Sequence, residues 1–186
     1  MEEDLEIIQK IKKGDKNAFN GLMEKYYKPV LNVIYRFYGC EKEEAEDVAQ
    51  EVFLRVLKGI DNFEGRSSFF TYLYKVAMNL CFTKRKLEKT VKISIDDPET
   101  SESLLIDNEG FVEREYERRE LEITIKKAVQ SLPIEQRSVV ILARFQNLSY
   151  EEIAGALNIS VQAVKSRLHR AMMSLKEKLA EVAKEL

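Results

Sequence analysis

The last part of the chain carries polar side chains that are suited to contacting nucleic acid. Residues 160–176 include several lysines and arginines and no acidic residue. Lysine and arginine bind phosphate oxygens, and glutamine, serine and histidine can hydrogen bond to base edges in the major groove. With 100° between successive residues of a helix, most of these side chains fall on one side. The candidates for DNA contact are Gln162, Lys165, Ser166, Arg167, His169 and Arg170.

The surrounding sequence predicts a helix-turn-helix that would present these side chains. Within "LSYEEIAGALNISVQAVKSRLHRAMMSL", Ser149 and Glu152 have the spacing of a capping box, Asn158 suits a tight turn, and Ser160 can cap the second helix. The buried stripe of that second helix is expected to be Val164, Leu168 and Ala171. A merely solvated basic surface is the alternative, and the coincidence of two caps, a turn and missing acids favours DNA binding.

The rest of the chain is also predicted to be helical. Glycine and proline are scarce, at seven and three residues, and helix formers are abundant. The fold class is therefore all-α. Helices are expected at Asp4–Lys13, Lys16–Gly39 with an interruption at Pro29, Glu43–Lys58, Phe69–Glu88, Arg114–Ser131 and Pro133–Gln146, before the two helices of the helix-turn-helix.

A change of composition after residue 89 divides the chain. Residues 96–122 contain eleven acidic and three basic residues, in a stretch rich in Ser and Thr. Such a segment cannot bury enough apolar surface to offset its ordering entropy. We expect two small helical domains, 1–89 and 114–186, joined by a flexible acidic linker, 90–113. A solvated surface loop within a single domain is the alternative, although such long loops are uncommon in compact domains.

The stretch "FEGRSSFFTYLYK", residues 63–75, is unusually aromatic. If Leu73 faces the core, Phe69 and Phe70 fall beside it, and Tyr74 lies on a boundary that the sequence does not decide. Another flank combines a ring, an amide and two cations, which suits stacking of single-stranded bases and contact with the DNA backbone. A surface tyrosine packed on a neighbour is the alternative for the ring. That flank consists of Tyr72, Lys75, Asn79 and Lys86.

Several classes of function are disfavoured by composition. His169 is the only histidine, and Cys40 and Cys81 match no metal or redox spacing, so we expect no metal, no cofactor and no catalytic residues. No apolar run approaches the ~20 residues of a spanning helix, and the acidic start does not resemble a secretory signal. We expect a cytoplasmic protein with no membrane contact of its own.

Two long segments resemble a known family. "SLPIEQRSVVILARFQNLSYEEIAGALNISVQAVKSRLHRAMMSL" is similar to the C-terminal domain of bacterial sigma factors of the extracytoplasmic-function class, and "EEAEDVAQEVFLRVLKGIDNFEGRSSFFTYLYKVAMNLCFTKRK" to their N-terminal domain. The resemblance implies a non-enzymatic factor that binds core RNA polymerase and promoter DNA. The N-terminal domain would recognise and melt the -10 element, and the C-terminal domain would hold the -35 element.

The resemblance also implies roles for particular residues. Asp47, Gln50 and Glu51 match a pattern that docks on the polymerase clamp, and helical spacing puts Leu54 beside them on the outer side. The loop before the aromatic helix would capture a flipped base. Its positions are Phe63, Gly65, Ser67 and Ser68. An anti-sigma protein that masks the two domains is a further implied partner.

Two other functions remain as alternatives. A dimeric helix-turn-helix repressor or response regulator would act without polymerase, but the sequence has neither a heptad seam nor a receiver-like pattern. A nucleic-acid enzyme would need clustered carboxylates or an activated nucleophile. Because the chain has a formal charge of -2, we expect weak promoter binding without polymerase.

Overall fold

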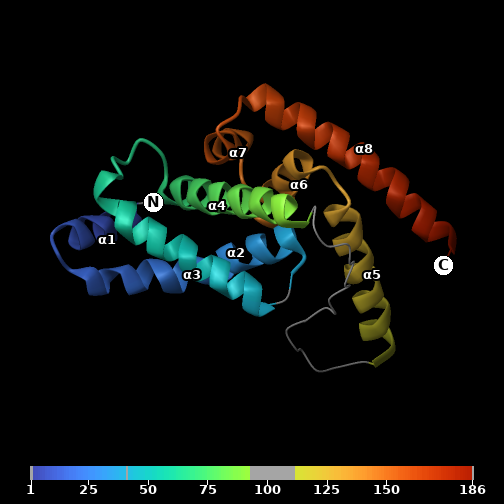
Figure 1. The fold of residues 1–186 in the computed structure, drawn as a ribbon, viewed down its shortest axis with the longest axis horizontal. Helices are drawn as coiled ribbons and strands as arrows, with labels where there is room; N and C mark the ends of the chain where they lie inside the picture. The colour runs from blue at the N-terminus through green and yellow to red at the C-terminus, as the bar shows by residue number, and fades with distance from the viewer. Residues whose placement is uncertain (1, 41, 93–111, 186) are drawn as a thin grey trace.

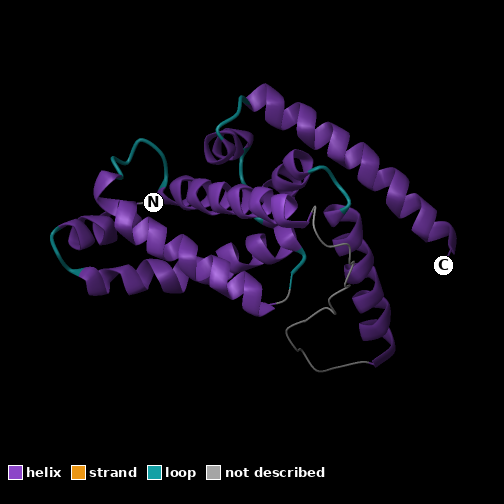
Figure 2. Ribbon diagram, in the orientation of Figure 1, coloured by secondary structure: helices purple, strands orange, loops and turns teal. Residues whose placement is uncertain are grey.

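The computed structural model describes residues 2–40, 42–92 and 112–185, and within them the predicted all-α fold is confirmed. Helices joined by turns and short loops make up these residues, with no strand among them (Figure 2). Most of the predicted linker, residues 93–111, lies outside the described residues. The helices on either side extend slightly into its expected range, because one ends at Lys92 and the next begins at Val112.

The N-terminal unit comprises the helices before residue 93 (Figure 1). Its elements are α1 (Glu2–Lys12), the 3₁₀ turn η1 (Lys16–Ala18), α2 (Phe19–Tyr38), α3 (Lys42–Gly59), the 3₁₀ turn η2 (Ile60–Asn62) and α4 (Phe69–Lys92). The predicted interruption at Pro29 is wrong, since α2 continues through it. Tyr26 and Val30, on either side of the proline, are both buried, so packing of one continuous apolar face compensates for the missing N–H.

The C-terminal unit comprises the helices after residue 111. Its elements are α5 (Val112–Gln130), α6 (Ile134–Val140), the π-helical turn η3 (Ile141–Phe145), α7 (Tyr150–Leu157) and α8 (Val161–Glu185). The single helix expected from Pro133 to Gln146 is therefore an α-helix that changes to π-helical hydrogen bonding at Ile141. Val139, Val140, Ile141 and Leu142 are all buried, which places the change of helix type in the core of this unit.

The two units lie against each other, with α7 beside α4 (Figure 1). Gly155 on α7 allows the close approach, because a β-carbon there would lie 3.1 Å from Cγ2 of Thr71 on α4. Arg137 of the C-terminal unit is buried and donates a 2.8 Å hydrogen bond to the carbonyl of Phe37, near the end of α2. That bond satisfies one of the carbonyls left without an intrahelical partner at a helix end.

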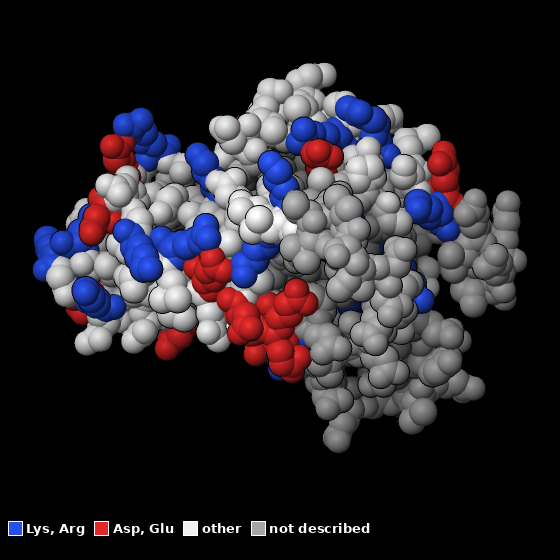
Figure 3. Space-filling model, viewed as in Figure 1, with Lys and Arg blue, Asp and Glu red and all other residues white. Residues whose placement is uncertain are grey.

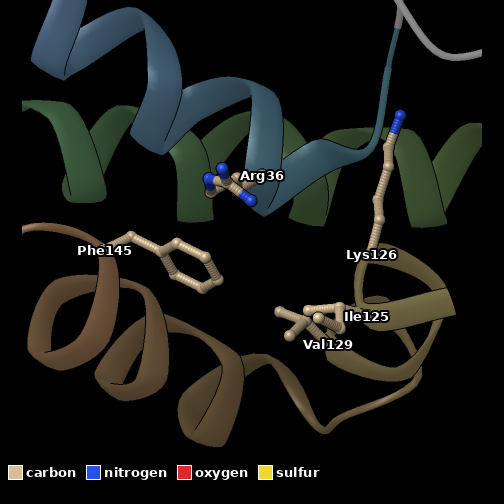
Figure 4. A pocket seen from close by; sticks show the side chains of 5 residues that line it. All are labelled: Arg36, Ile125, Lys126, Val129 and Phe145. Carbon is tan, nitrogen blue, oxygen red and sulfur yellow. The ribbon is translucent and has the colours of Figure 1, made fainter. Parts of the chain in front are cut away.

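A small pocket lies along the same junction, between α2, α5 and η3 (Figure 4). The guanidinium of Arg36 lies 4.0 Å from the centre of the Phe145 ring, and burial lowers the pKa of Arg36. Lys126 donates a 2.8 Å hydrogen bond to the hydroxyl of Tyr35. Polar and cation-ring contacts therefore contribute to the junction, together with the van der Waals packing of α4 on α7.

Candidate nucleic-acid interface

The predicted helix-turn-helix is formed by α7, the turn at Asn158 and α8. Ser149 Oγ accepts a 3.2 Å hydrogen bond from the amide of Glu152, and the Glu152 carboxylate accepts a 2.9 Å bond from the amide of Ser149. Asn158 has a φ of 53°, in the left-handed region that asparagine tolerates. Ser160 Oγ accepts a 3.1 Å bond from the amide of Ala163. Each feature expected from the sequence is confirmed.

The outer face of α8 presents the predicted DNA-contacting side chains. Val164, Leu168 and Ala171 are buried, which confirms the expected inner stripe. Gln162, Lys165, His169 and Arg170 are exposed, whereas Ser166 and Arg167 are half-buried. Arg170 donates a 2.9 Å hydrogen bond to Ser166 Oγ. Blue lysine and arginine side chains lie along this helix in Figure 3. Most of these groups thus face solvent in the structure as it stands.

The loop between η2 and α4 is held by the rest of the N-terminal unit. The Phe63 ring is buried, 5.1 Å from the Tyr72 ring centre, and the Phe63 carbonyl accepts a 2.7 Å hydrogen bond from Lys12 Nζ. Gly65 has a φ of 74°, which favours glycine. Ser67 is exposed. Ser68 instead caps α4, because its Oγ accepts a 3.1 Å bond from the amide of Thr71.

The predicted single-strand-binding flank of α4 lies on the surface. Lys75, Asn79 and Lys86 are exposed along it, and Tyr72 is half-buried, with its pKa raised by burial. Figure 3 shows an acidic patch elsewhere, over the N-terminal end of α3, where Glu43 and Glu44 lie in the first turn. The structure therefore brings one ring, one amide and two cations together on an accessible stripe.

The other aromatic residues of α4 have structural contacts. Phe69 is buried as expected, but Phe70 is half-buried, so its predicted place in the core is only partly correct. Tyr74, undecided from the sequence, is fully buried and donates a 2.8 Å hydrogen bond to Oε1 of Gln146 in the C-terminal unit. Burial raises the pKa of Tyr74. This tyrosine belongs to the junction between the units.

The outer face of α3 contains the four residues predicted to bind polymerase. Asp47, Gln50 and Leu54 are exposed, and Leu54 keeps 57% of its surface accessible. Glu51 is half-buried between two cations: its carboxylate lies 2.9 Å from Lys84 Nζ on α4 and 2.7 Å from Arg55. The hydrogen bond from Lys84 and that from Arg55 hold the pKa of Glu51 below its usual value. The Glu51 carboxylate is therefore already paired within the protein.

The described residues also bear on metal binding and on membrane insertion. They contain no group of three or more His, Cys, Asp or Glu side chains placed to hold a metal ion. No helix within them is long and apolar enough to cross a membrane. Cys81 is buried, and this burial raises the pKa of its thiol to about 12, so the thiol stays protonated at neutral pH.

Comparison with known proteins identifies the family. The model for sigma-70 region 2 matches residues 22–89, and the model for sigma-70 region 4 matches residues 123–175. The RNA polymerase sigma-H factor of Pseudomonas aeruginosa is 34% identical, across 99% of this chain and 97% of the relative. The ECF RNA polymerase sigma factor SigW of Bacillus subtilis is 32% identical, across 94% and 96%. The chain belongs to the RNA polymerase sigma factors of the extracytoplasmic-function class, which recognise promoters.

Solved structures show the same fold. CnrH, in complex with the cytosolic domain of CnrY, has a TM-score of 0.68 at 20% identity, across 94% of this chain and 96% of that one. The sigma factor RpoE from Bartonella quintana, in complex with the anti-sigma factor NepR, has a TM-score of 0.70 at 23% identity, across 87% and 96%. These likenesses extend the match of fold over both units.

Proposed function

We propose that the two surfaces described above divide promoter recognition between them. The outer face of α8 binds the -35 element as duplex, through Gln162, Lys165, Ser166, Arg167, His169 and Arg170. The observation that carries this assignment is an exposed, acid-free face on the second helix of a capped helix-turn-helix. Its cations bind phosphates, and its glutamine, serine and histidine reach base edges.

The -10 element is bound as single-stranded DNA by the N-terminal unit. Tyr72 offers a stacking surface, and Lys75, Asn79 and Lys86 follow the backbone beside it. The loop formed by Phe63, Gly65, Ser67 and Ser68 captures a flipped base, which offsets the few kcal/mol lost by unstacking. Promoter melting of this kind uses binding free energy, and the chemistry of RNA synthesis belongs to the polymerase.

Core polymerase binds the outer face of α3. Exposed Leu54, with Asp47 and Gln50 one turn or more away along the helix, forms a mixed apolar and polar patch of the kind that marks a partner surface. Glu51 joins this patch when Lys84 and Arg55 release it. We place this binding in the cytoplasm, where the polymerase is.

The closed arrangement of the two units gives a second reason, besides charge, to expect weak promoter binding by the free chain. Positions -10 and -35 are 25 base pairs apart, about 85 Å at a rise of 3.4 Å per pair. A compactly packed chain of 186 residues has a radius of gyration of about 16 Å, so with α7 in contact with α4 we do not expect the two proposed DNA-binding surfaces to span that distance. The units must separate on core polymerase. An anti-sigma partner that holds them together would keep the protein inactive.

Run-off transcription with purified core polymerase on a library of randomised promoters tests the proposal. We expect initiation only when this chain is added, with selected templates sharing two motifs about 25 base pairs apart. Failure to initiate on any template would contradict the proposal. Tight binding of the free chain to a palindrome as a dimer, at physiological salt, would favour the repressor alternative instead.

A further inference from the structure

Helix α1 contacts the predicted base-capturing loop, although it precedes the segment matched by the region 2 family model, which begins at residue 22. Lys12, at the end of α1, donates its 2.7 Å hydrogen bond to the carbonyl of Phe63, 51 positions later in the chain. A hydrogen bond from an ammonium group is stronger than one between neutral groups. The first residue of the loop is therefore tied to α1.

A second side chain of α1 lies against the same loop. Cδ2 of Leu5 is 3.8 Å from the position that a β-carbon would occupy on Gly65. Gly65 has positive φ, so it marks the point where the loop turns. Leu5 and Lys12 are two turns apart on α1 and lie beside the loop at neighbouring places, Gly65 and Phe63. The helix thus supports the loop along its first half.

Helix α1 is itself fixed to the core of the N-terminal unit. Ile8 and Ile11 are buried. Asp4 is 5% exposed, and its carboxylate accepts hydrogen bonds of 2.7 Å from the Tyr26 hydroxyl and 2.6 Å from Lys25 Nζ. The ring of Tyr26 in turn lies 5.6 Å from that of Phe69 at the start of α4. Both ends of the loop are therefore held by one rigid set of contacts.

We propose that α1 positions the loop for base capture and that Lys12 is the positioning residue. This inference rests on the proposed role of the loop at the -10 element. Fixing the Phe63 carbonyl fixes the place of its ring against Tyr72, and with it the entrance that a flipped base must use. A loop ordered before binding does not lose that conformational entropy when the base arrives.

The test measures base capture in the complete holoenzyme with promoter DNA that carries 2-aminopurine at each -10 position in turn. Lys12→Met removes the donor and the charge, Lys12→Arg keeps both, and Lys10→Met makes the same charge change on an exposed lysine of α1. We expect Lys12→Met to reduce the equilibrium for base unstacking about fivefold, the factor that ~1 kcal/mol for one hydrogen bond gives. Lys12→Arg and Lys10→Met should stay within about twofold of wild type.

Salt dependence separates positioning from direct contact with DNA. A lysine that binds a phosphate contributes about one unit to the slope of log K against log salt concentration, and its loss lowers the slope. We expect Lys12→Met to leave the slope, core binding and -35 duplex binding unchanged. A slope lower by about one, or capture equal to that of Lys10→Met, would overturn the inference.

Two further outcomes separate an error in the proposed function of the loop from an error in the role of Lys12. If the wild-type holoenzyme unstacks no base, the proposed function of the loop is wrong, irrespective of Lys12. If Lys12→Met also weakens core binding, Leu5→Ala becomes the deciding variant. Leu5 is the other α1 side chain that lies beside the loop, and it is 37% exposed. Reduced capture by Leu5→Ala with normal core binding supports the inference, and wild-type capture contradicts it.

Discussion

The two proposed DNA-binding surfaces differ in how many of their side chains already make contacts inside the protein. On α8, Gln162, Lys165 and His169 are exposed. Arg170 bonds Ser166 within the same face, and Lys165 Nζ lies 5.9 Å from the centre of the Tyr150 ring. On the loop and α4, Phe63 is buried and Ser68 caps the helix. The proposed α8 surface is therefore almost wholly exposed, whereas the proposed loop and α4 surface combines exposed groups with side chains that also hold the fold together.

This difference fits the two forms of DNA that the surfaces are proposed to bind. A duplex groove is a regular shape that a preformed helix can enter. A flipped base needs a pocket, and two of the groups proposed to form it, Phe63 and Ser68, also have contacts within the fold. Substitutions of the aromatic residues at the start of α4 should therefore affect folding and DNA binding together. Substitutions on the exposed face of α8 should affect DNA binding alone.

The largest expected effect is on stability, from truncating the ring that starts α4. Phe69 is 1% exposed and packs against Tyr26 and Phe63, so Phe69→Ala should lower the free energy of unfolding by about 3 to 5 kcal/mol. Met173→Ala on α8, where the side chain is 49% exposed, should change it by less than about 0.5 kcal/mol. Urea denaturation measures both free energies of unfolding. If Phe69→Ala and Met173→Ala destabilised the protein equally, the proposed difference in stability between the α4 and α8 surfaces would be wrong.

The next effect is pH-dependent and concerns the support beneath the aromatic cluster. Burial raises the pKa of Asp4, but hydrogen bonds from Lys25 and Tyr26 outweigh it and leave this pKa below its usual value. A lowered carboxyl pKa gives stability that is complete above the unfolded value, about 3.9, and disappears as pH falls through the folded value. Asp4→Asn should cost roughly 1.5 to 3 kcal/mol at neutral pH.

The difference between wild type and Asp4→Asn should therefore shrink below about pH 4. Thermal unfolding across pH 3 to 7 follows it. Asp61→Asn, at an exposed position of η2, serves as the matched control and should show no such trend. A constant difference at every pH would mean that the Asp4 carboxylate charge contributes nothing to α1 docking.

Tyr72 tests the shared use of the α4 surface most directly. Tyr72→Ala removes a stacking surface worth about 1 to 3 kcal/mol per base, so promoter opening should slow about tenfold. The ring is half-buried, so stability should fall too, but less than for Phe69→Ala. Stopped-flow fluorescence on a labelled promoter gives the opening rate. If Tyr72→Ala opens the promoter at the wild-type rate, Tyr72 is not the residue on which the base stacks.

The smallest expected effect is a change of salt dependence on α8. Lys165→Met should lower the slope of log K against log salt for -35 binding by about one, with no measurable change in thermal stability. Lys178, exposed on the same helix but beyond the predicted face, provides the control substitution Lys178→Met. An equal slope change in both variants would show that general charge, and not the predicted face, governs binding.

The helix-turn-helix could be predicted nearly completely because its signals are local. Ser149 and Glu152 are three residues apart, Asn158 tolerates left-handed backbone, and Val164, Leu168 and Ala171 follow the helical period. The inner faces of α3 and α4 followed the same logic, with Val48, Val52 and Leu73 among the buried residues. Periodicity identifies which side of a helix is apolar, and that sufficed here.

What the sequence did not reveal depends on contacts between distant segments. The hydrogen bond of Tyr74 is to Gln146 and that of Lys12 is to Phe63, and no local sequence pattern links the members of either pair. Ser68 is different, since a serine directly before an apolar helix is a capping signal that could have been recognised. The partners of Glu51 include Lys84 on another helix, which required the packing angle of α3 and α4.

Gly155 has a consequence for sequence variation among relatives of this chain. The residue leaves room for α7 to approach Thr71, and even a methyl group there would force a neighbour to move by a few tenths of an ångström. A long side chain would separate the helices, although it would strengthen α7 as an isolated helix, because glycine is a poor helix former. A homologue with glutamine or lysine at this position would therefore join its two halves differently, so a single residue reports the geometry of the junction.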